Sequence, residues 1–297
     1  MIVPLGDAPN PRGIPVVTWL LIGANVAIYV LLTLPLSATA PDLRDPLLRQ
    51  YVEVVTRDVP QAAVRDILQH LSAYDLFIFR YGFRPDTPAL GPLFFSLFLH
   101  AGFLHLFGNM LFLWIYGDNV EHRMGAVPFL FAYLLTGVAA TLFHTLFDLR
   151  SGLPLVGASG AISGILGFYF LWFPRNQVRL FFVLFPFFMD VISVSARVVL
   201  LVYVVADNLL PFLLTRGVGG GGVAYGAHLG GFLSGLAAAW WIDRREISQR
   251  PEKYKAVHAT APLPDQPSDP DGGRAGPVHT TCGRTGDCRR TCGSPEG

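Results

Sequence analysis

Long apolar stretches separated by short polar ones dominate this chain. Four of them lack Asp, Glu, Lys and Arg: Ile14–Leu36, Ala126–Phe147, Val156–Phe173 and Ala224–Ile242. Uncharged runs of about 18 to 25 residues are long enough to cross a hydrocarbon core of roughly 30 Å as helices. With two apolar segments that carry a few charges, they predict six transmembrane helices, at about Ile14–Leu36, Phe103–Glu121, Ala126–Phe147, Ala158–Phe173, Ala196–Leu214 and Ala224–Ile242.

Two other segments are apolar in part but do not fit a span. The long first loop, residues 37–92, mixes charges with apolar residues at helical spacing, which predicts an amphipathic element on the surface. Leu180–Ser195 is strongly apolar but is interrupted by Pro186 and Asp190. We therefore expect this segment to lie in or near the membrane interface rather than across the bilayer.

Composition agrees with an all-α membrane protein. Hydrophobic residues make up 52% of the 297 residues and charged residues 14%, against about 25% in soluble domains. We expect an N-terminal segment (1–13), a six-helix membrane domain (14–243) and a polar, Pro- and Gly-rich tail (244–297) that is disordered. The formal net charge of +1 gives no reason to expect a nucleic-acid partner.

Basic residues beside the short loops predict the orientation. They concentrate on the side of the second loop, the fourth loop and the C-terminus, with Arg123, Arg175, Arg179, Arg244, Arg245, Arg250, Lys253 and Lys255. The third and fifth loops offer Arg150 and Arg216. By the positive-inside rule both termini are cytoplasmic, and we expect a multi-pass protein of a bacterial inner membrane.

Six spans place one serine and one histidine at the same depth. Ser159, in "VGASGAISGILG", and His228, in "GAHLGGFLSG", each lie about one turn into a helix that enters from the outer face. If Leu180–Ser195 were a seventh span, His228 would lie near the opposite surface. A neutral imidazole within hydrogen-bond reach can accept the proton of a serine hydroxyl, so the two residues are candidates for a nucleophile and its general base.

A second polar pair can stabilise an oxyanion at that depth. His105 and Asn109 are four residues apart and therefore share one helix face. Ser159 also begins a helix, where free backbone N–H groups favour a developing negative oxygen. Gly157 and Gly160 leave room for a substrate backbone beside the serine.

The motifs together resemble the rhomboid family of intramembrane serine proteases. The match comprises "GASG" at 157–160, "AHLGGFLSG" at 227–235 and "HLFGN" at 105–109, in the family's order and on its second, fourth and sixth helices. The resemblance implies a Ser159–His228 dyad without a third carboxylate, and cleavage of single-spanning membrane proteins in or near their transmembrane segment. It implies no metal and no cofactor.

The resemblance extends to one more site and fails at two. Glu121 and Arg123, in "VEHRMG", look like the family's polar cluster at the inner end of helix two. Some members carry a tyrosine one turn after the nucleophile that packs on the imidazole, but this chain has Ser163, which leaves the orientation of His228 without an explanation. The first loop also lacks the Trp-Arg pair of some members.

Other interpretations stay open at this point. A serine in a glycine-rich membrane helix is often a packing residue, and His100, His144 and Asn25 are more readily assigned to helix contacts, as is Asp207 with Arg197. A catalytically silent client-binding relative, or a small transporter, would also carry polar intramembrane residues. The glycines of "RGVGGGGVAY" suit either a linker or a mobile cap, and the tail cysteines 282, 288 and 292 match no common zinc pattern.

Overall fold

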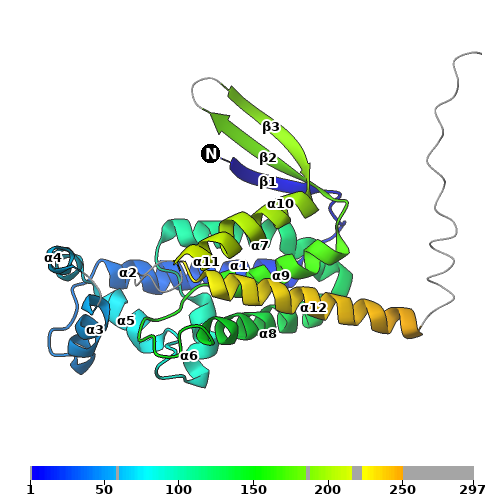
Figure 1. Cartoon of the computed structure of the whole chain (residues 1–297). Helices are drawn as coiled ribbons and strands as arrows, with labels where there is room; N and C mark the ends of the chain where they lie inside the picture. Colours follow the sequence, from blue (N-terminus) through cyan, green and yellow to red (C-terminus); the bar gives the residue numbers. More distant parts are fainter. Residues whose placement is uncertain (1, 58–59, 185–187, 216–222, 250–297) are drawn as a thin grey trace, which may run out of the picture. The chain divides into compact units, whose positions relative to one another are not determined.

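The chain folds mainly into helices, to which one small sheet is added (Figure 1). The computed structural model describes residues 2–57, 60–184, 188–215 and 223–249. The chain divides into two compact units, Met1–Glu246 and Ile247–Gly297, and every site residue belongs to the first. The prediction of a mostly helical protein is confirmed, whereas a purely helical fold is wrong because three strands are present.

The long helices follow the predicted order. The first is continuous over Val16–Ser37 and consists of α1 (Val16–Ile28), a π-helical turn η1 (Tyr29–Thr33) and α2 (Leu34–Ser37). The others are α7 (Phe103–Met124), α8 (Ala126–Thr145), α9 (Ser159–Trp172), α10 (Ala196–Val204) continued by a π-helical turn η3 (Val205–Leu209) and α11 (Leu210–Thr215), and α12 (Tyr225–Gln249).

Length and composition identify at least three membrane spans. They are Val16–Ser37, Ala126–Thr145 and Ala196–Leu214. A fourth follows if Leu90–Phe98 and α7, which meet at 85°, form one broken span. The chain is thus a multi-pass membrane protein, and the count of six spans stays a prediction because α9 has only 14 residues and α12 does not pass the same test.

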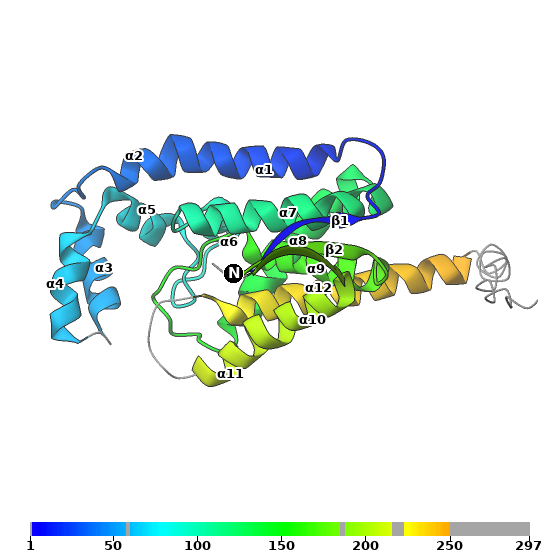
Figure 2. The same ribbon diagram turned by 90° about the horizontal axis from the view of Figure 1, so that it is seen from above.

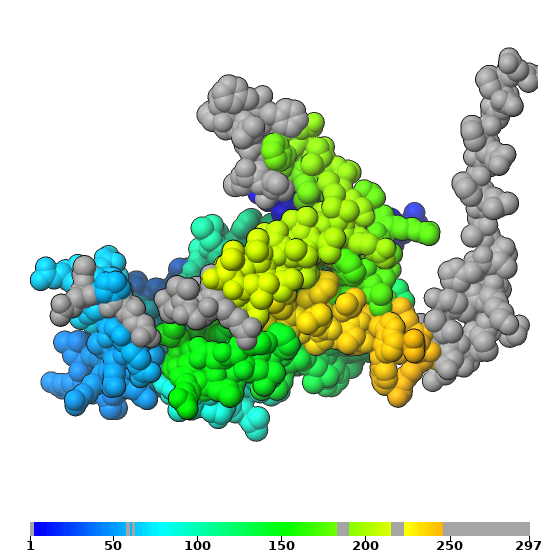
Figure 3. All heavy atoms as spheres, viewed as in Figure 1, coloured from blue at the N-terminus to red at the C-terminus, as the bar shows by residue number. Residues whose placement is uncertain are grey.

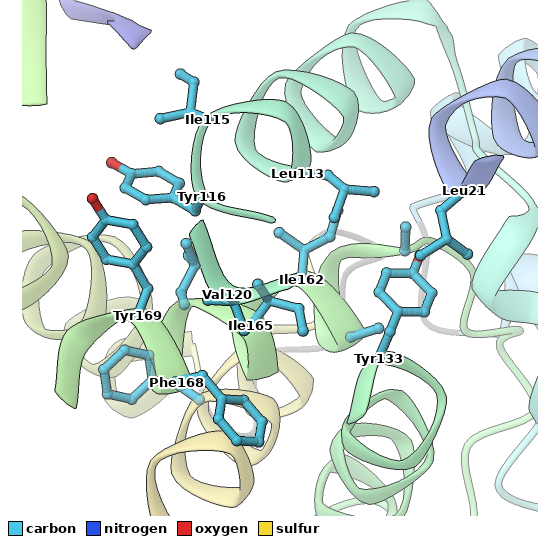
Figure 4. Packing of buried hydrophobic residues seen from close by; sticks show 14 of the residues in the cluster. Leu21, Leu113, Ile115, Tyr116, Val120, Tyr133, Ile162, Ile165, Phe168 and Tyr169 are labelled. Carbon is cyan, nitrogen blue, oxygen red and sulfur yellow. The ribbon is translucent and has the colours of Figure 1, made fainter. Parts of the chain in front are cut away.

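Helix α9 lies in the centre of the bundle. Nearly all its residues after Ser159 are buried, and it contacts both α7 and α8. Figure 4 shows how its Ile162 meets Leu113 of α7, beside Tyr133 of α8 and Leu21 of α1. Burial on every side explains why its sequence is apolar all round instead of amphipathic.

Helix α1 runs beside α7 (Figure 2) and is capped by it. The carboxylate of Glu121 accepts hydrogen bonds from the backbone N–H of Val17 (2.9 Å), the N–H of Thr18 (2.7 Å) and the Thr18 hydroxyl (2.8 Å). These N–H groups at the start of a helix have no partner within it, and a carboxylate there also favours the helix dipole. Glu121 therefore fixes the end of one span against another.

The first loop contains helices, as its amphipathic pattern predicted. They are α3 (Pro46–Thr56), α4 (Gln61–Gln69) and α5 (Ala73–Tyr81). Helix α6 (Leu90–Phe95) and a 3₁₀ turn η2 (Ser96–Phe98) follow at the end of the loop, before α7. Backbone hydrogen bonds join this loop to the third loop: Phe83 and Leu155 exchange two, at 3.2 and 2.7 Å. The first and third loops therefore lie at the same end of the bundle.

An antiparallel sheet forms at the end of the helix bundle opposite the first and third loops, near the C-terminal ends of α7 and α9. It has the order β1 (Ile2–Ala8), β2 (Gln177–Leu184), β3 (Phe188–Ser195). The expected interfacial segment Leu180–Ser195 is thus part of a hairpin that pairs with the N-terminal strand, because its β-branched residues favour strands. Its exclusion as a membrane helix is confirmed, and its location at the interface stays a prediction.

Two predictions concern residues outside the described part of the chain. The glycines of the fifth loop fall within 216–222, and the tail with its three cysteines falls within 250–297.

The helix before the fifth loop, Ala196–Leu214, is only 11% buried in its most apolar stretch, and its side chains form part of the face shown in Figure 3.

Candidate active site

Gly157 brings the backbone against α7 immediately before α9 begins. Its φ of +126° lies in the region that favours glycine. A Cβ at this position would stand 2.8 Å from Cε1 and Nε2 of the His105 ring and 3.6 Å from Ser159 Oγ. The His105 ring and the Ser159 hydroxyl therefore border the same point of the backbone, which only a glycine can occupy.

Ser159 is the first residue of α9 and is half-buried. The N–H groups of a first helical turn have no partner within the helix, so they are free to bind a negative oxygen. In the part of the chain that the structure describes, no hydrogen bond engages Ser159 Oγ. The hydroxyl is therefore available.

Glycines allow α9 and α12 to touch through their backbones. A Cβ on Gly231 would overlap the carbonyl oxygen of Gly160, and a Cβ on Gly235 would overlap that of Gly164. Such contacts are typical of small-xxx-small pairs in membrane helices, where close approach provides the packing energy. The two helices are thereby fixed in register along their shared length.

That register brings the first turns of the two helices together. Ser159 precedes Gly160, and His228 lies three residues before Gly231. A Cβ on Gly160 would also lie 3.9 Å from Cβ of Ala227. The first turns of α9 and α12 are therefore adjacent, and no hydrogen bond joins Ser159 to His228 among the described residues.

The imidazole of His228 is held by a residue that the sequence did not single out. Its Nδ1 lies 2.6 Å from Oδ1 of Asn208, which belongs to η3 and is 2% exposed. The ring of Tyr203 on α10 stacks on the imidazole, with centroids 6.4 Å apart and planes inclined by 29°. A buried amide in a span is itself a functional signal, and Asn208 directly follows Asp207, which the sequence did flag.

Ser163 has a partner that explains its place in α9. Its hydroxyl lies 2.6 Å from the phenol oxygen of Tyr203. The tyrosine that stacks on the imidazole thus comes from α10, and a serine stands where some rhomboids carry the tyrosine. Sequence spacing could not reveal this because the two residues are forty positions apart.

Asn109 and His105 occupy one face of α7, as predicted. Asn109 is 7% exposed, and its Nδ2 is a buried donor for which the described residues provide no acceptor. His105 is half-buried, and its ring meets that of His100 at 5.1 Å. An unused buried donor, one turn along α7 from the His105 ring that borders Gly157, is the kind of group that oxyanion binding requires.

Three other polar residues, Asn25, Arg197 and Arg123, have partners of their own, whereas Asp207 has none within the described ranges. Asn25 donates from Nδ2 to the Leu21 carbonyl at 2.7 Å, within its own helix. Arg197 lies over the Phe170 ring at 5.7 Å, and Asp207 is exposed, so the expected pairing of these two is not seen among the described residues. Arg123, near Glu121, forms an ion pair with Asp243 (2.8 Å).

Comparison with known proteins points to one family. A family model described as a rhomboid domain matches residues 89–245. "Rhomboid protein 1, mitochondrial" of Saccharomyces cerevisiae is 33% identical over 166 residues, which are 54% of this chain and 44% of that protein. "RHOMBOID-like protein 1" of Arabidopsis thaliana is 31% identical over 193 residues, 56% of this chain and 45% of that protein.

A bacterial relative carries a protease name. "Rhomboid protease GluP" of Bacillus subtilis is 44% identical over 69 residues, 23% of this chain and 13% of that protein. The chain spans less than half the length of each of these three relatives. The two longer matches are to a mitochondrial and a plant protein, so they do not support a bacterial inner membrane as the location.

Proposed function

Because the rhomboid model matches more than half of its length, the chain belongs to the rhomboid family, and we propose that it is an intramembrane serine endopeptidase. Its substrates would be single-spanning membrane proteins, cut in or near their transmembrane segment. The bilayer is its other partner, as for any multi-pass membrane protein. Neither a metal nor a cofactor enters the proposal.

The first half of the reaction forms an acyl-enzyme. Ser159 Oγ attacks the scissile carbonyl carbon while Nε2 of His228 takes the hydroxyl proton. The negative oxygen of the tetrahedral intermediate is bound by the N–H of Ser159 and by the side chains of His105 and Asn109. The C–N bond then breaks, and the imidazolium returns its proton to the leaving amine.

The second half consumes water. A water molecule gives a proton to Nε2 of His228 and attacks the ester carbonyl, with the same donors on the oxygen. The second intermediate collapses when the C–Oγ bond breaks, and the proton passes back to Ser159. The products are the new carboxylate and the regenerated hydroxyl.

One observation carries this proposal. Because Gly231 and Gly235 have no side chain, the backbone of α12 lies against Gly160 and Gly164 of α9. This contact requires that the first turns of α9 and α12 be adjacent. A nucleophile and a base on those turns, with Asn109 offering a spare buried donor, match the needs of acyl transfer. A packing serine would need none of these neighbours.

The orientation in the membrane is also part of the proposal. We infer six spans with both termini on the cytoplasmic side, or its equivalent in an organelle. The backbone bonds between the first and third loops support this, since odd-numbered loops of a six-span chain share one side. The ion pair of Arg123 with Asp243 supports it likewise, because it joins the ends of the second and sixth spans.

A fluorophosphonate probe tests the proposal most directly. Purified protein should be labelled at a single serine, and Ser159→Ala should abolish the labelling. Ser234→Ala is the matched control: this serine lies in α12 and donates to the Gly231 carbonyl at 2.8 Å, so its loss should leave the labelling intact.

Cleavage of a panel of single-span model substrates, followed by mass spectrometry of the fragments, would then identify the bond that is cut. A folded wild-type protein that neither reacts with the probe nor cleaves any substrate would contradict the proposal. It would favour a client-binding role instead.

A further inference from the structure

A serine–histidine dyad needs its imidazole in one particular tautomer. Neutral imidazole carries its proton on either Nδ1 or Nε2, and only the nitrogen without the proton can act as a base. In triads a carboxylate selects the tautomer by accepting from Nδ1–H. The proposed dyad has no third carboxylate, so another group must make this selection.

Asn208 is placed to do so. Its Oδ1, an acceptor only, lies 2.6 Å from Nδ1 of His228, so the hydrogen bond requires a proton on Nδ1. Nε2 is then left with its lone pair. If the amide nitrogen of Asn208 faced Nδ1 instead, it would donate to Nδ1, and the proton of the imidazole would have to be on Nε2. The assignment of the tautomer therefore depends on which way the amide of Asn208 faces.

A second hydrogen bond fixes the amide. Nδ2 of Asn208 donates to the backbone carbonyl of Tyr203 at 2.7 Å. If the amide were rotated, Oδ1 would face that carbonyl oxygen, and two acceptors would meet in a site that is 2% exposed. The orientation with Oδ1 toward His228 is therefore the one that the surroundings enforce.

The local backbone and Tyr203 complete the support. Asn208 lies in the π-helical turn η3, and such turns occur frequently at functional sites. Tyr203 covers one face of the imidazole and binds Ser163 of α9 through its hydroxyl. The fifth span thus links the helix of the proposed nucleophile to that of the proposed base.

We propose that Asn208 is the positioning residue of this site: its side-chain oxygen holds His228 as the Nδ1–H tautomer, so that Nε2 faces the reaction as the base. The inference rests on the proposed function for its role in catalysis. Its statement about the tautomer stands on the hydrogen bonds alone. Asn208 touches neither substrate nor the reacting atoms.

The test compares two substitutions of different chemistry. Asn208→Leu keeps the approximate shape and removes the acceptor, and we expect kcat to fall by about 10- to 100-fold with KM unchanged. Asn208→Asp restores an acceptor for Nδ1–H and should recover most of the loss. Asn25→Leu removes a buried amide from another span and should change neither constant.

Nitrogen-15 NMR of histidine-labelled protein in micelles reads the tautomer without reference to activity. The His228 signals, assigned with His228→Gln, should show protonated Nδ1 and unprotonated Nε2 at neutral pH. In Asn208→Leu they should shift toward a mixture of tautomers, and in Asn208→Asp they should return.

Two results would overturn the inference. One is a wild-type spectrum with the proton on Nε2, which needs no variant and so does not depend on whether Asn208→Leu folds. The other is an Asn208→Leu protein with wild-type kcat and an unchanged spectrum. If the wild type were inactive but its tautomer depended on Asn208, the positioning role would stand and the protease proposal alone would fail.

Discussion

Glycines at facing positions set the distance between α9 and α12. At Gly235 the nearest atom to an added Cβ is a backbone oxygen, that of Gly164, which no change of rotamer can move. At Gly164 an added Cβ would instead meet the side chain of Thr136, on α8. The close approach of α9 to both α12 and α8 therefore requires that these positions carry no side chain.

Gly235→Ala should separate the two helices and destabilise the protein. Overpacking of this kind costs about 1–3 kcal/mol, and the shift would also move His228 from Ser159. Thermal unfolding in detergent, followed by intrinsic fluorescence, would measure the loss. Gly23→Ala in α1 is the matched control, since an added Cβ there meets nothing within 4 Å, and an equal loss in both variants would refute the packing argument.

Asn109→Ala should slow cleavage without affecting the fold. Its Nδ2 has no acceptor among the described residues, so its removal breaks no internal hydrogen bond. Loss of one oxyanion donor lowers kcat by about 100- to 1,000-fold. Steady-state kinetics on a model substrate, with melting curves alongside, would show this, and unchanged turnover would remove Asn109 from the proposed oxyanion site.

For single residues, the sequence predicted a role where a residue belonged to a motif and also lay at the same membrane depth as the other candidates. Ser159, His228, His105 and Asn109 could be proposed as candidates because spacing on a helix determines which face and level a residue occupies. Asn208 and Tyr203 could not be assigned roles, since their partners lie on other helices and only the rotation of the fifth span brings them together.

At the scale of elements, the N-terminal strand β1 is tied to the bundle by one carboxylate. Asp7 accepts hydrogen bonds from the Tyr169 hydroxyl, from Nδ2 of Asn119 (3.0 Å) and from Nδ2 of Asn176 (3.3 Å). It is 4% exposed. The sequence predicted no structure for residues 1–13, because a single short strand has no periodicity long enough to separate it from a loop.

Asp7→Ala should loosen this strand. The buried donors of Tyr169 and Asn119 would lose their acceptor, at a cost of about 1–3 kcal/mol in unfolding free energy. Denaturation in mixed micelles would measure it. Asp190→Ala, in the exposed part of β3, should have little effect, and equal losses for both carboxylates would contradict the anchoring role.

The same carboxyl predicts a pH dependence. Burial raises the pKa of Asp7 above its ordinary 3.8, although hydrogen bonds from Tyr169 and Asn176 oppose the shift. A raised pKa in the folded state gives stability that is full below the unfolded pKa and is lost as pH rises through the folded pKa. The melting temperature of the wild type relative to Asp7→Asn should therefore rise from pH 7 to about pH 4. A constant difference would contradict this.

At the scale of the whole molecule, contacts between loops divide the segments that connect the helices into two groups, one at each end of the bundle. The first and third loops are joined through Phe83 and Leu155, and the N-terminal strand is joined to the hairpin of the fourth loop. This sorting is the one that six spans produce. The sequence could predict this grouping from span lengths and basic residues. It could not predict the sheet that joins the N-terminal segment to the fourth loop, because strand pairing is non-local.

Cysteine accessibility in sealed vesicles tests the topology. After the three tail cysteines are replaced by serine, Val223→Cys and Leu68→Cys should react with an impermeant maleimide from one side, and Asp190→Cys and Arg245→Cys from the other. All four positions are exposed. Labelling of Val223→Cys and Arg245→Cys from the same side would overturn the six-span arrangement.

The shortness of α9 has a consequence for how a hydrolase can work inside lipid. Its 14 residues rise about 21 Å, several ångströms less than the hydrocarbon thickness of roughly 30 Å. A helix of this length that stands along the bilayer normal cannot reach both surfaces, so at least one of its ends lies within the hydrocarbon layer. Ser159 is the residue at the N-terminal end. If that end is the recessed one, a hydrolase built on Ser159 needs a route for water through the loops in front of α9.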